Sequence, residues 1–380
     1  MAKRTTTKAG ARNVNMFGAD PHKRTITATV LDERGGVLGT ETFRVSGDGH
    51  REMERWALQF GPIARWGIEG ASGIGRHSAM FLIRQGHDVR DVCPNRTAEQ
   101  ARHRQQGKTD VLDSVRIARE TQADAGVPVA FKRAGDERGP DEVTELLGLW
   151  HKARRSINKS RQHLLNEAEA LLGELPEAIR DALPDTADVR SRLRSIARRD
   201  QTISHDAPTM LRLRFLDQTT TAVADLDARD REAVRELGVL NRRAGTTLTE
   251  LCGIAERSAA ELLVEVGDPR RFTSEGGFAR FNGTAPLPAS SAEGKGEPVR
   301  HRLNPGGNRR VNAVLHRMAV TQLRCEPRAR QIYDDARKHG HTKREAMRIL
   351  KRQLSNLVYR QMIRDQRRQH HEIREQRDAA

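Results

Sequence analysis

Short apolar runs separated by polar turns dominate the first part of the chain. Three of these runs predict β-strands, at Asn15–Ala19, Thr25–Leu31 and Val37–Phe43. The glycine-rich stretch Asp32–Gly36 between the second and third runs is typical of a hairpin turn. A helix over about Gly49–Phe60 is predicted next, because its apolar residues recur at helical spacing on one face.

Helices and strands then alternate up to about residue 125. Strands are predicted at Ala64–Glu69 and Asp88–Cys93, and helices at Gly75–Gln85 and from about Thr109 to Ala123. Three antiparallel strands followed by alternating helices and parallel strands is the order of ribonuclease-H-like folds. We therefore predict an α/β domain of this type over residues 12–125.

A long helical region is predicted beyond a glycine- and proline-rich linker or loop at 126–140. An apolar position recurs every seven residues within about 141–173, at Trp150, Ile157, Leu164 and Leu171. This spacing is typical of a coiled coil, in which the seam pairs two subunits, but a helix packed within one chain shows it too. A second helix, over about 218–247, is expected to complete an antiparallel hairpin within residues 141–248.

The C-terminal part of the chain is predicted to be mainly helical. Leu251–Ile254 followed by Ala259–Leu263 resembles a helix-hairpin-helix element, in which a glycine lets backbone N–H groups approach a phosphate. A basic segment rich in glycine and proline follows at 282–310. We expect a helical domain over 249–365 and a frayed polar tail over 366–380.

The charge of the chain narrows the class of partner. Its 380 residues contain 67 Lys and Arg against 51 Asp and Glu, a formal net charge of +16, which favours a polyanion such as nucleic acid. No apolar run approaches the roughly 20 residues that a membrane-spanning helix needs, so a cytoplasmic protein is expected. The cysteines Cys93, Cys252 and Cys325 are scattered and predict neither a disulfide framework nor a zinc site, only small apolar side chains.

Four acidic residues stand where a metal-binding fold would place them. Asp20 and Glu69 each end an apolar run, and Asp110 and Asp113 lie at the predicted start of a helix. Carboxylates in this arrangement can meet around Mg²⁺, which prefers oxygen ligands and keeps positions open for phosphate oxygens. A single Asp at a strand end is usually a turn or cap residue, but four in this order favour a metal site. His22, just after Asp20, is explained equally well by a phosphate contact or by a surface turn.

A second candidate for chemistry is the loop that contains Ser290 and Ser291. Serines between glycines and prolines are usually turn formers, and a serine hydroxyl is a weak nucleophile without activation. The basic residues around the loop change this interpretation, because arginines stabilise the charge that builds on a transferring phosphoryl group. They are Lys295, Arg300, Arg302, Arg309 and Arg310.

These residues together resemble the DEDD-type transposases of bacterial insertion sequences. In the first half the matching motifs are Gly18–Lys23, Gly67–Glu69 and Lys108–Asp113. In the second half they are Leu251–Ile254, Glu265–Asp268, Arg271-Phe272, Phe281–Pro286, the serine loop and Gly307–Asn312. The resemblance covers nearly the whole chain. It implies a RuvC-like N-terminal domain, a central coiled-coil hairpin and a C-terminal transposase domain with a catalytic serine.

The resemblance also implies a mechanism and partners. Asp20, Glu69, Asp110 and Asp113 would hold Mg²⁺, and Ser291 would attack the DNA backbone to form a phosphoserine link. Ala292 stands where the family usually has glycine, which leaves Ser290 as the alternative nucleophile. Lys108 and the basic residues near the serine loop would bind nucleic acid. The expected partners are donor and target DNA, a non-coding bridge RNA and further copies of the chain in a dimer or tetramer, with nucleoid association during the reaction.

One alternative function remains open at this point. A two-metal, RuvC-like nuclease of the junction-resolving type would use the four acids without serine chemistry. Replacement of Ser291 by alanine separates the two, because only the recombinase loses its covalent link to DNA.

Overall fold

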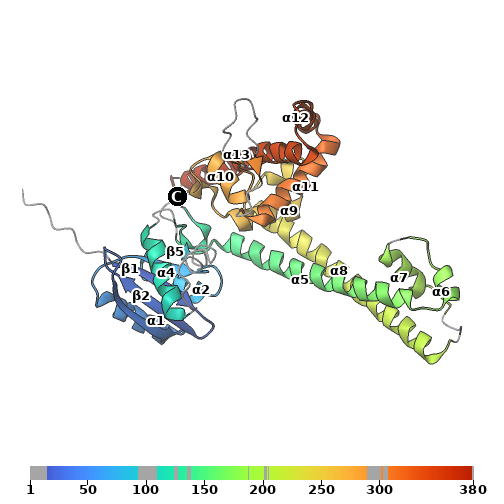
Figure 1. Ribbon diagram of the computed structural model, residues 1–380, viewed down its shortest axis with the longest axis horizontal. Helices are drawn as coiled ribbons and strands as arrows, with labels where there is room; N and C mark the ends of the chain where they lie inside the picture. Colours follow the sequence, from blue (N-terminus) through green and yellow to red (C-terminus); the bar gives the residue numbers. More distant parts are fainter. Residues whose placement is uncertain are drawn as a thin grey trace, which may run out of the picture. The chain divides into compact units, whose positions relative to one another are not determined.

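The computed structural model shows two compact units, and each is described by itself. It describes residues 15–92, 109–123, 127–134, 138–186, 188–200, 203, 205–288, 301–302 and 307–378. The first unit is an α/β unit that contains the chain up to Asp141 and the segment Val266–Thr273. The second unit is helical and contains the rest of the chain (Figure 1).

The α/β unit has a five-stranded sheet with the order β3-β2-β1-β4-β5. Its strands are β1 (Asn15–Pro21), β2 (Thr25–Leu31), β3 (Val37–Arg44), β4 (Ile63–Glu69) and β5 (Val89–Val92). The first three strands are antiparallel to one another, whereas β4 pairs parallel with both β1 and β5. The strand positions, their order along the chain and their directions are those predicted from the sequence.

Three helices of this unit lie at the predicted positions. They are α1 (Gly47–Leu58), α2 (Arg76–Arg84) and α4 (Asp110–Ala123). The main core contains Phe17 and Trp66 from the sheet together with Met53 of α1 and Leu82 of α2, all fully buried. Because side chains alternate along a strand, this core covers one face of the sheet and leaves the other face for α4.

Part of the predicted linker belongs to the fold of this unit. Val127 and Ala130 are buried, and Arg90 of β5 donates a hydrogen bond of 3.2 Å to the carbonyl of Val127. The short helix η1 (Ala130–Lys132) follows. The prediction of a linker or mobile loop over the whole of 126–140 was therefore wrong for these residues, because the apolar run Val127–Phe131 contributes Val127 and Ala130 to hydrophobic clusters of the unit.

The helical unit contains the predicted antiparallel hairpin. Helix α5 (Glu142–Gly173) packs against α8 (Ala207–Arg243), and ion pairs of 2.8 Å join Arg154 to Asp230 and Arg161 to Asp227. The short helices α6 (Glu177–Asp181) and α7 (Val189–Ala197) lie at its far end (Figure 1).

Helix α8 starts earlier than the prediction of about 218. Pro208 does not interrupt it, because a proline in the first turn of a helix costs no hydrogen bond.

The remaining elements of the helical unit are short helices and one small hairpin, apart from a long last helix. They are η2 (Leu248–Glu250), α9 (Glu256–Val266), α10 (Glu275–Asn282), β6 (Leu287–Pro288), β7 (His301–Arg302), α11 (Arg309–Cys325), α12 (Pro327–Lys338) and α13 (Lys343–Asp378). No described helix is both long enough and apolar enough to cross a membrane.

The polar C-terminus is not a frayed tail, because α13 continues to Asp378. Arg368 donates a hydrogen bond of 2.7 Å to the carbonyl of Gly245. Asp365 accepts one of 2.8 Å from the backbone N–H of Thr247. These bonds attach the part of α13 around Asp365 and Arg368 to the turn after α8.

The cysteines also differ from the prediction. Cys252 and Cys325 are exposed, and their sulfur atoms lie 2.9 Å apart. Cys93 lies outside the described residues. The prediction of small apolar side chains was therefore wrong for the two cysteines that the structure describes.

Candidate metal site and serine loop

The ends of two neighbouring parallel strands hold the first two predicted acids. Asp20 is the last residue but one of β1, and Glu69 is the last residue of β4. Ala19 pairs with Ile68 in the parallel register, so Asp20 and Glu69 follow at matching positions. Because side chains alternate along each strand, both carboxylates are directed to the face of the sheet that α4 covers.

Two glycines allow α4 to lie unusually close to this face. A Cβ atom at Gly18 would lie 2.1 Å from the backbone nitrogen of Ala118. A Cβ atom at Gly67 would lie 1.8 Å from Oγ1 of Thr121. No real side chain tolerates such distances, so the absence of a Cβ at both positions sets how closely the helix approaches the strands.

A buried hydrogen bond fixes the same helix against the middle of the sheet. The hydroxyl groups of Thr29 in β2 and Ser114 in α4 lie 2.7 Å apart. Ser114 directly follows Asp113 in the first turns of α4, which also carry Asp110. The packing of α4 therefore places the D-x-x-D pair beside the carboxyl end of β1.

His22 joins the acids of β1 and α4. Its Nε2 lies 3.4 Å from Oδ2 of Asp20 and 3.1 Å from Oδ1 of Asp110. The backbone N–H of His22 donates a hydrogen bond of 2.7 Å to the carbonyl of Thr25, which fixes the turn after β1. One potential ligand atom from each of the three residues lies within 4.8 Å of the other two. The Asp20 side chain is 12% exposed and those of His22 and Asp110 are 45% and 59% exposed, so the group opens to solvent on one side.

This set of donors fits a divalent cation. Carboxylate oxygens suit Mg²⁺ and Mn²⁺, and an imidazole nitrogen is a ligand for transition metals. Three donors on one side of an ion leave other positions open for water and for phosphate oxygens.

Glu69 and Asp113 are placed differently. Oδ1 of Asp113 accepts a hydrogen bond of 2.6 Å from Nη1 of Arg116, and both side chains are largely buried. Among the described residues, the group of close ligand atoms contains neither Glu69 nor Asp113. The structure thus brings Asp20 and Asp110 together and leaves the role of the other two acids as a prediction.

The predicted nucleophiles lie outside the described residues. This applies to Ser290 and Ser291 and to the basic residues Lys108, Lys295 and Arg300. The structure does describe the residues on both sides of the serine loop. Leu287 pairs with Arg302, and Pro288 pairs with His301, in the short antiparallel hairpin of β6 and β7.

Two asparagines hold the base of the serine loop together. Asn282 at the end of α10 is fully buried, and its Nδ2 donates a hydrogen bond of 2.8 Å to Oγ of Ser355 in α13. Asn308 caps α11, and its backbone N–H donates to the carbonyl of Phe281 at 2.6 Å. These motifs on either side of the loop are therefore structural, because they bring the two ends of the loop together.

Two of the arginines that were predicted to bind nucleic acid lie in the same region. Arg310 forms an ion pair with Glu265, whose side chain is only 8% exposed and also accepts a hydrogen bond of 2.9 Å from Asn308. Arg309 is exposed at the first turn of α11. Of these two arginines, Arg309 is the one that the fold leaves available to a ligand.

A second group of charged residues lies within the α/β unit, near the segment Val266–Thr273 that belongs to this unit. Asp91 at the end of β5 accepts hydrogen bonds of 3.0 Å from the backbone N–H of Ala71 and 3.4 Å from Oγ of Ser72. Burial raises the pKa of Asp91, and these hydrogen bonds and the charges of Lys132 and Arg271 partly offset this effect. Burial also lowers the pKa of Arg271 to about 10. The opposite charges of Asp91 in the sheet and Arg271 in the segment therefore attract each other.

Sequence reasoning missed His22 and the two glycines as parts of the candidate metal site. The signal for Gly18 and Gly67 was present, since each lies two residues before an acid at a strand end. The signal for His22 was not decisive. Nothing in the sequence around a histidine in a turn predicts that a helix much later in the chain packs beside it.

Both halves of the chain match family models of transposases. Residues 17–175 match a model described as Transposase, of the DEDD type of IS110. Residues 245–334 match a model described as Transposase IS116/IS110/IS902 family. The chain therefore belongs to the DEDD-type IS110 family of transposases, as its motifs predicted.

Two individual proteins are also similar to parts of the chain. Over 119 residues it is 34% identical to the "Insertion element IS110 uncharacterized 43.6 kDa protein" of Streptomyces coelicolor (strain ATCC BAA-471 / A3(2) / M145). That alignment covers 31% of this chain and 28% of the relative, so the chain spans less than a third of the relative's length. The solved structure "T. thermophilus RuvC in complex with Holliday junction substrate" aligns with 28% of this chain and 90% of its own, at 12% identity and a TM-score of 0.22.

Proposed function

We propose that this chain is a DNA recombinase that excises and inserts an insertion sequence. The observation that carries the proposal is the approach of Asp20, His22 and Asp110 in a chain whose two halves both match transposase families. The α/β unit would be a ribonuclease-H-like domain of the RuvC type, in keeping with its strand order. Asp20, Glu69, Asp110 and Asp113 would hold Mg²⁺, which would offset negative charge on a bound phosphodiester.

The covalent step is assigned to Ser291. Its Oγ would attack a backbone phosphorus atom, so that an Oγ–P bond forms and the bond from phosphorus to a sugar oxygen breaks. The serine proton would pass to solvent and the leaving sugar oxygen would take one up. Attack by a sugar hydroxyl of another strand on the phosphoserine would reverse these changes and join the strands. The described base of the loop supports this role, because it brings the two ends of the serine loop together.

The partners in this proposal are donor and target DNA, a non-coding bridge RNA and further copies of the chain. The net charge of +16 supports a polyanionic partner. The small share of aromatic residues, 4%, agrees with recognition by base pairing to an RNA instead of by stacking. The RNA part is tested by sequencing RNA that copurifies with the protein from cells carrying the whole element. RNA reads that do not rise above those of an unrelated basic protein would remove this part of the proposal.

The main experiment compares Ser291→Ala, Ser290→Ala and Asp20→Asn in a recombination assay on labelled DNA. We expect Ser291→Ala to abolish both recombination and the protein–DNA adduct that survives denaturation. Asp20→Asn is expected to lower recombination about a thousandfold, because metal-assisted stabilisation contributes several kcal/mol. Ser290→Ala is the matched control and is expected to keep the adduct. Unchanged strand cleavage by Ser291→Ala, with only the acids required, would show a metal-dependent nuclease instead.

A further inference from the structure

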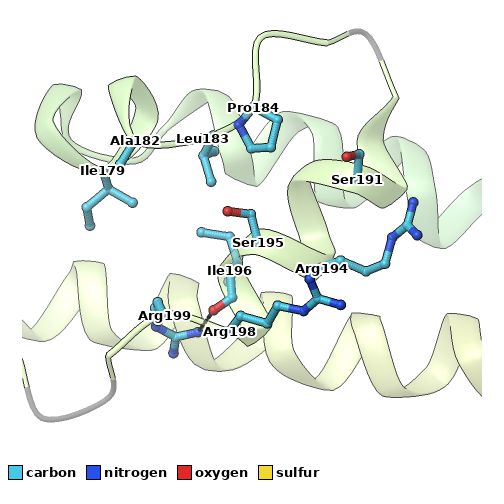
Figure 2. Close-up of a pocket in the computed structure, with 10 residues that line it drawn as sticks. All are labelled: Ile179, Ala182, Leu183, Pro184, Ser191, Arg194, Ser195, Ile196, Arg198 and Arg199. Carbon is cyan, nitrogen blue, oxygen red and sulfur yellow. Dashed lines mark hydrogen bonds between the residues drawn. The ribbon is translucent and has the colours of Figure 1, made fainter.

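Two hollows on the helical unit differ in the charge around them. The larger, about 510 Å³, lies at the far end of the α5–α8 hairpin between the α6 segment and α7 (Figure 2). Its lining includes Arg194, Arg198 and Arg199. The smaller, about 370 Å³, is lined by Tyr333 of α12 and by Lys343, Arg344, Met347 and Arg348 of α13.

The larger hollow is weak as a site for an anion. Arg199 is already held by two hydrogen bonds of 2.7 Å to Asp217, and Arg194 lies 3.7 Å from Asp188. Residues 177–200 contain six arginines and five acidic residues, so the local charge nearly cancels. Its floor of Ile179, Leu183 and Ile196 is part of the packing between α6 and α7 (Figure 2).

The smaller hollow lies in a region with a clear excess of positive charge. Residues 327–352, which form α12 and the first turns of α13, contain nine lysines and arginines and three acidic residues. Lys343 and Arg344 are exposed at the start of α13, and the Arg348 side chain is 37% exposed. A local excess of positive charge at a concave surface attracts phosphate groups.

The carboxylate of Glu345 offsets only one of these positive charges, and it also caps the helix. Oε2 of Glu345 accepts hydrogen bonds of 2.8 Å from both the backbone N–H and the hydroxyl of Thr342. The backbone N–H of Glu345 donates in return to Oγ1 of Thr342 at 3.3 Å, which completes a capping box. Arg348 lies 3.8 Å from the Glu345 carboxylate.

The rest of the lining suits a nucleobase. Tyr333 and Met347 are half-buried, and they give an aromatic ring and a thioether next to the basic groups. A base stacks on an aromatic ring without preference for its sequence, while lysine and arginine contact the adjoining phosphates. A volume of about 370 Å³ falls within the range of about 300–1,000 Å³ for small-molecule sites.

We propose that this hollow binds one unpaired nucleotide of a nucleic-acid strand. Tyr333 would stack on the base, and Lys343, Arg344 and Arg348 would contact the phosphates on either side. The inference rests on the proposed function only in taking nucleic acid as the partner, since it concerns a site separate from the acids and the serine loop.

Binding of labelled single-stranded DNA and RNA, followed by fluorescence anisotropy without divalent metal, tests this proposal. Tyr333→Ala is expected to weaken binding about tenfold, whereas Tyr333→Phe keeps the ring and binds like the unchanged chain. Lys343→Ala weakens binding and lowers the salt dependence, because one phosphate contact is lost. Comparison of the DNA and RNA arms identifies which strand the site prefers.

Arg194→Ala is the matched control, because it removes one positive charge at the other hollow. It is expected to bind as tightly as the unchanged chain, and thermal melting verifies that every variant is folded. The proposal is overturned if Tyr333→Ala binds normally, or if Lys343→Ala and Arg194→Ala weaken binding equally. The assay is run in the Asp20→Asn chain as well, so a failure here is separate from a failure of the recombinase reaction.

A second, independent feature is the pair of exposed thiols in the helical unit. Sγ of Cys252 and Sγ of Cys325 lie 2.9 Å apart although 73 positions separate them in the sequence. Cys252 lies in the turn before α9, and Cys325 is the last residue of α11. The main-chain carbonyl of Cys252 accepts a hydrogen bond of 2.8 Å from Nε2 of Gln322 in α11.

The neighbouring glycine keeps this turn close to the helix. Gly253 has φ of +89°, and a Cβ there would lie 3.1 Å from both the Cα and the carbonyl oxygen of Met318. The left-handed conformation and the close approach both favour glycine. The two sulfur atoms are therefore held together by the backbone around them.

We infer that Cys252 and Cys325 form an intramolecular disulfide when the protein meets a peroxide. Both thiols lose their hydrogen atoms, an S–S bond forms, and hydrogen peroxide is reduced to two molecules of water. The bond would fasten the turn at 251–254 to the end of α11. A neighbouring thiol raises the pKa of Cys252 to about 11, so oxidation is expected to be faster at pH 9 than at pH 7.

Peptide mapping of the Cys93→Ser chain after peroxide treatment tests this inference. We expect a linked pair of peptides that contain Cys252 and Cys325 and that separate again with dithiothreitol. The oxidised chain is also expected to melt higher by on the order of 5 °C. Cys252→Ser is the control without a link. Two free thiols after treatment, or a disulfide between two chains on a non-reducing gel, would overturn the inference.

Discussion

The two predicted chemical sites of this chain are built in different ways. The acids of the α/β unit lie on two strands and on a helix that packs against them, and Gly18 and Gly67 set how closely this helix approaches. The serine loop is held at its base by a short hairpin, by the buried Asn282 and by the half-buried Asn308. Close packing fixes the position of a group tightly, because packed atoms cannot overlap. Hydrogen bonds at the base of a loop fix only where the loop begins and ends.

Among the variants that test this difference between the two sites, Gly18→Ala is expected to have the largest effect on stability and activity. The new methyl group would overlap backbone atoms of α4, so the helix must move away from the strand. We expect the free energy of unfolding to fall by about 3 kcal/mol and recombination to fall at least about a hundredfold, because the acids of α4 are displaced. Urea unfolding and the recombination assay measure the two effects.

Gly47→Ala is the matched control for that change, because a Cβ there would meet only the side chain of Arg51 at ordinary distance. It is expected to leave both stability and activity almost unchanged. Equal losses in the two variants would show that close packing of α4 is not what positions the acids.

Asn282→Ala tests the loop base. It removes the buried hydrogen bond to Ser355 and is expected to lower the free energy of unfolding by about 2 kcal/mol. The covalent DNA adduct should decrease while binding of Mn²⁺, measured by calorimetry, stays the same. Asn166→Ala, at an exposed position of α5, is the control. A parallel loss of Mn²⁺ binding would mean that the two sites do not behave independently.

Arg116→Gln has a smaller expected effect and tests the role of Asp113. It removes the partner that orients this carboxylate, and such partners typically contribute about tenfold or more to metal affinity. We expect about tenfold weaker Mn²⁺ binding. Arg119→Gln on the same helix provides the control for loss of charge. If the two variants bind Mn²⁺ alike, Asp113 is not a metal ligand.

The smallest expected effect is the pH dependence contributed by Asp91. Burial raises its pKa above the ordinary value of 3.8, so the folded chain binds this proton more tightly than the unfolded chain. Stability from this group is therefore present at low pH and is lost as pH rises from about 4 through the raised pKa. Asp91→Asn should remove this part of the slope in urea unfolding between pH 4 and pH 7. An unchanged slope would show that Asp91 does not titrate in this range.

The sequence predicted the sheet and the long helices well because these depend on local periodicity. Alternating apolar residues located the strands within a few residues, and the hairpin of α5 and α8 followed from apolar spacing. The family was also predicted, because its motifs recur in a fixed order.

Contacts between distant residues could not be predicted in the same way. The approach of His22 to Asp110 depends on the path of α4 across the sheet, and the proximity of Cys252 to Cys325 depends on the turn before α9. Neither has a repeating pattern. The helical end of the chain was missed because its polar residues bond to a turn more than a hundred residues earlier.

The packing of Val266–Thr273 in the α/β unit bears on how this family can evolve. Gly267 accommodates Lys132 so closely that a Cβ would lie 2.5 Å from the lysine Cβ, and Asp268 donates its backbone N–H to the carbonyl of Lys132 at 3.0 Å. The N-terminal fold is thus completed by residues encoded in the second half of the gene. If related elements exchanged the two halves of this gene, the residues that meet at this contact would no longer match. The two halves are therefore expected to be inherited together.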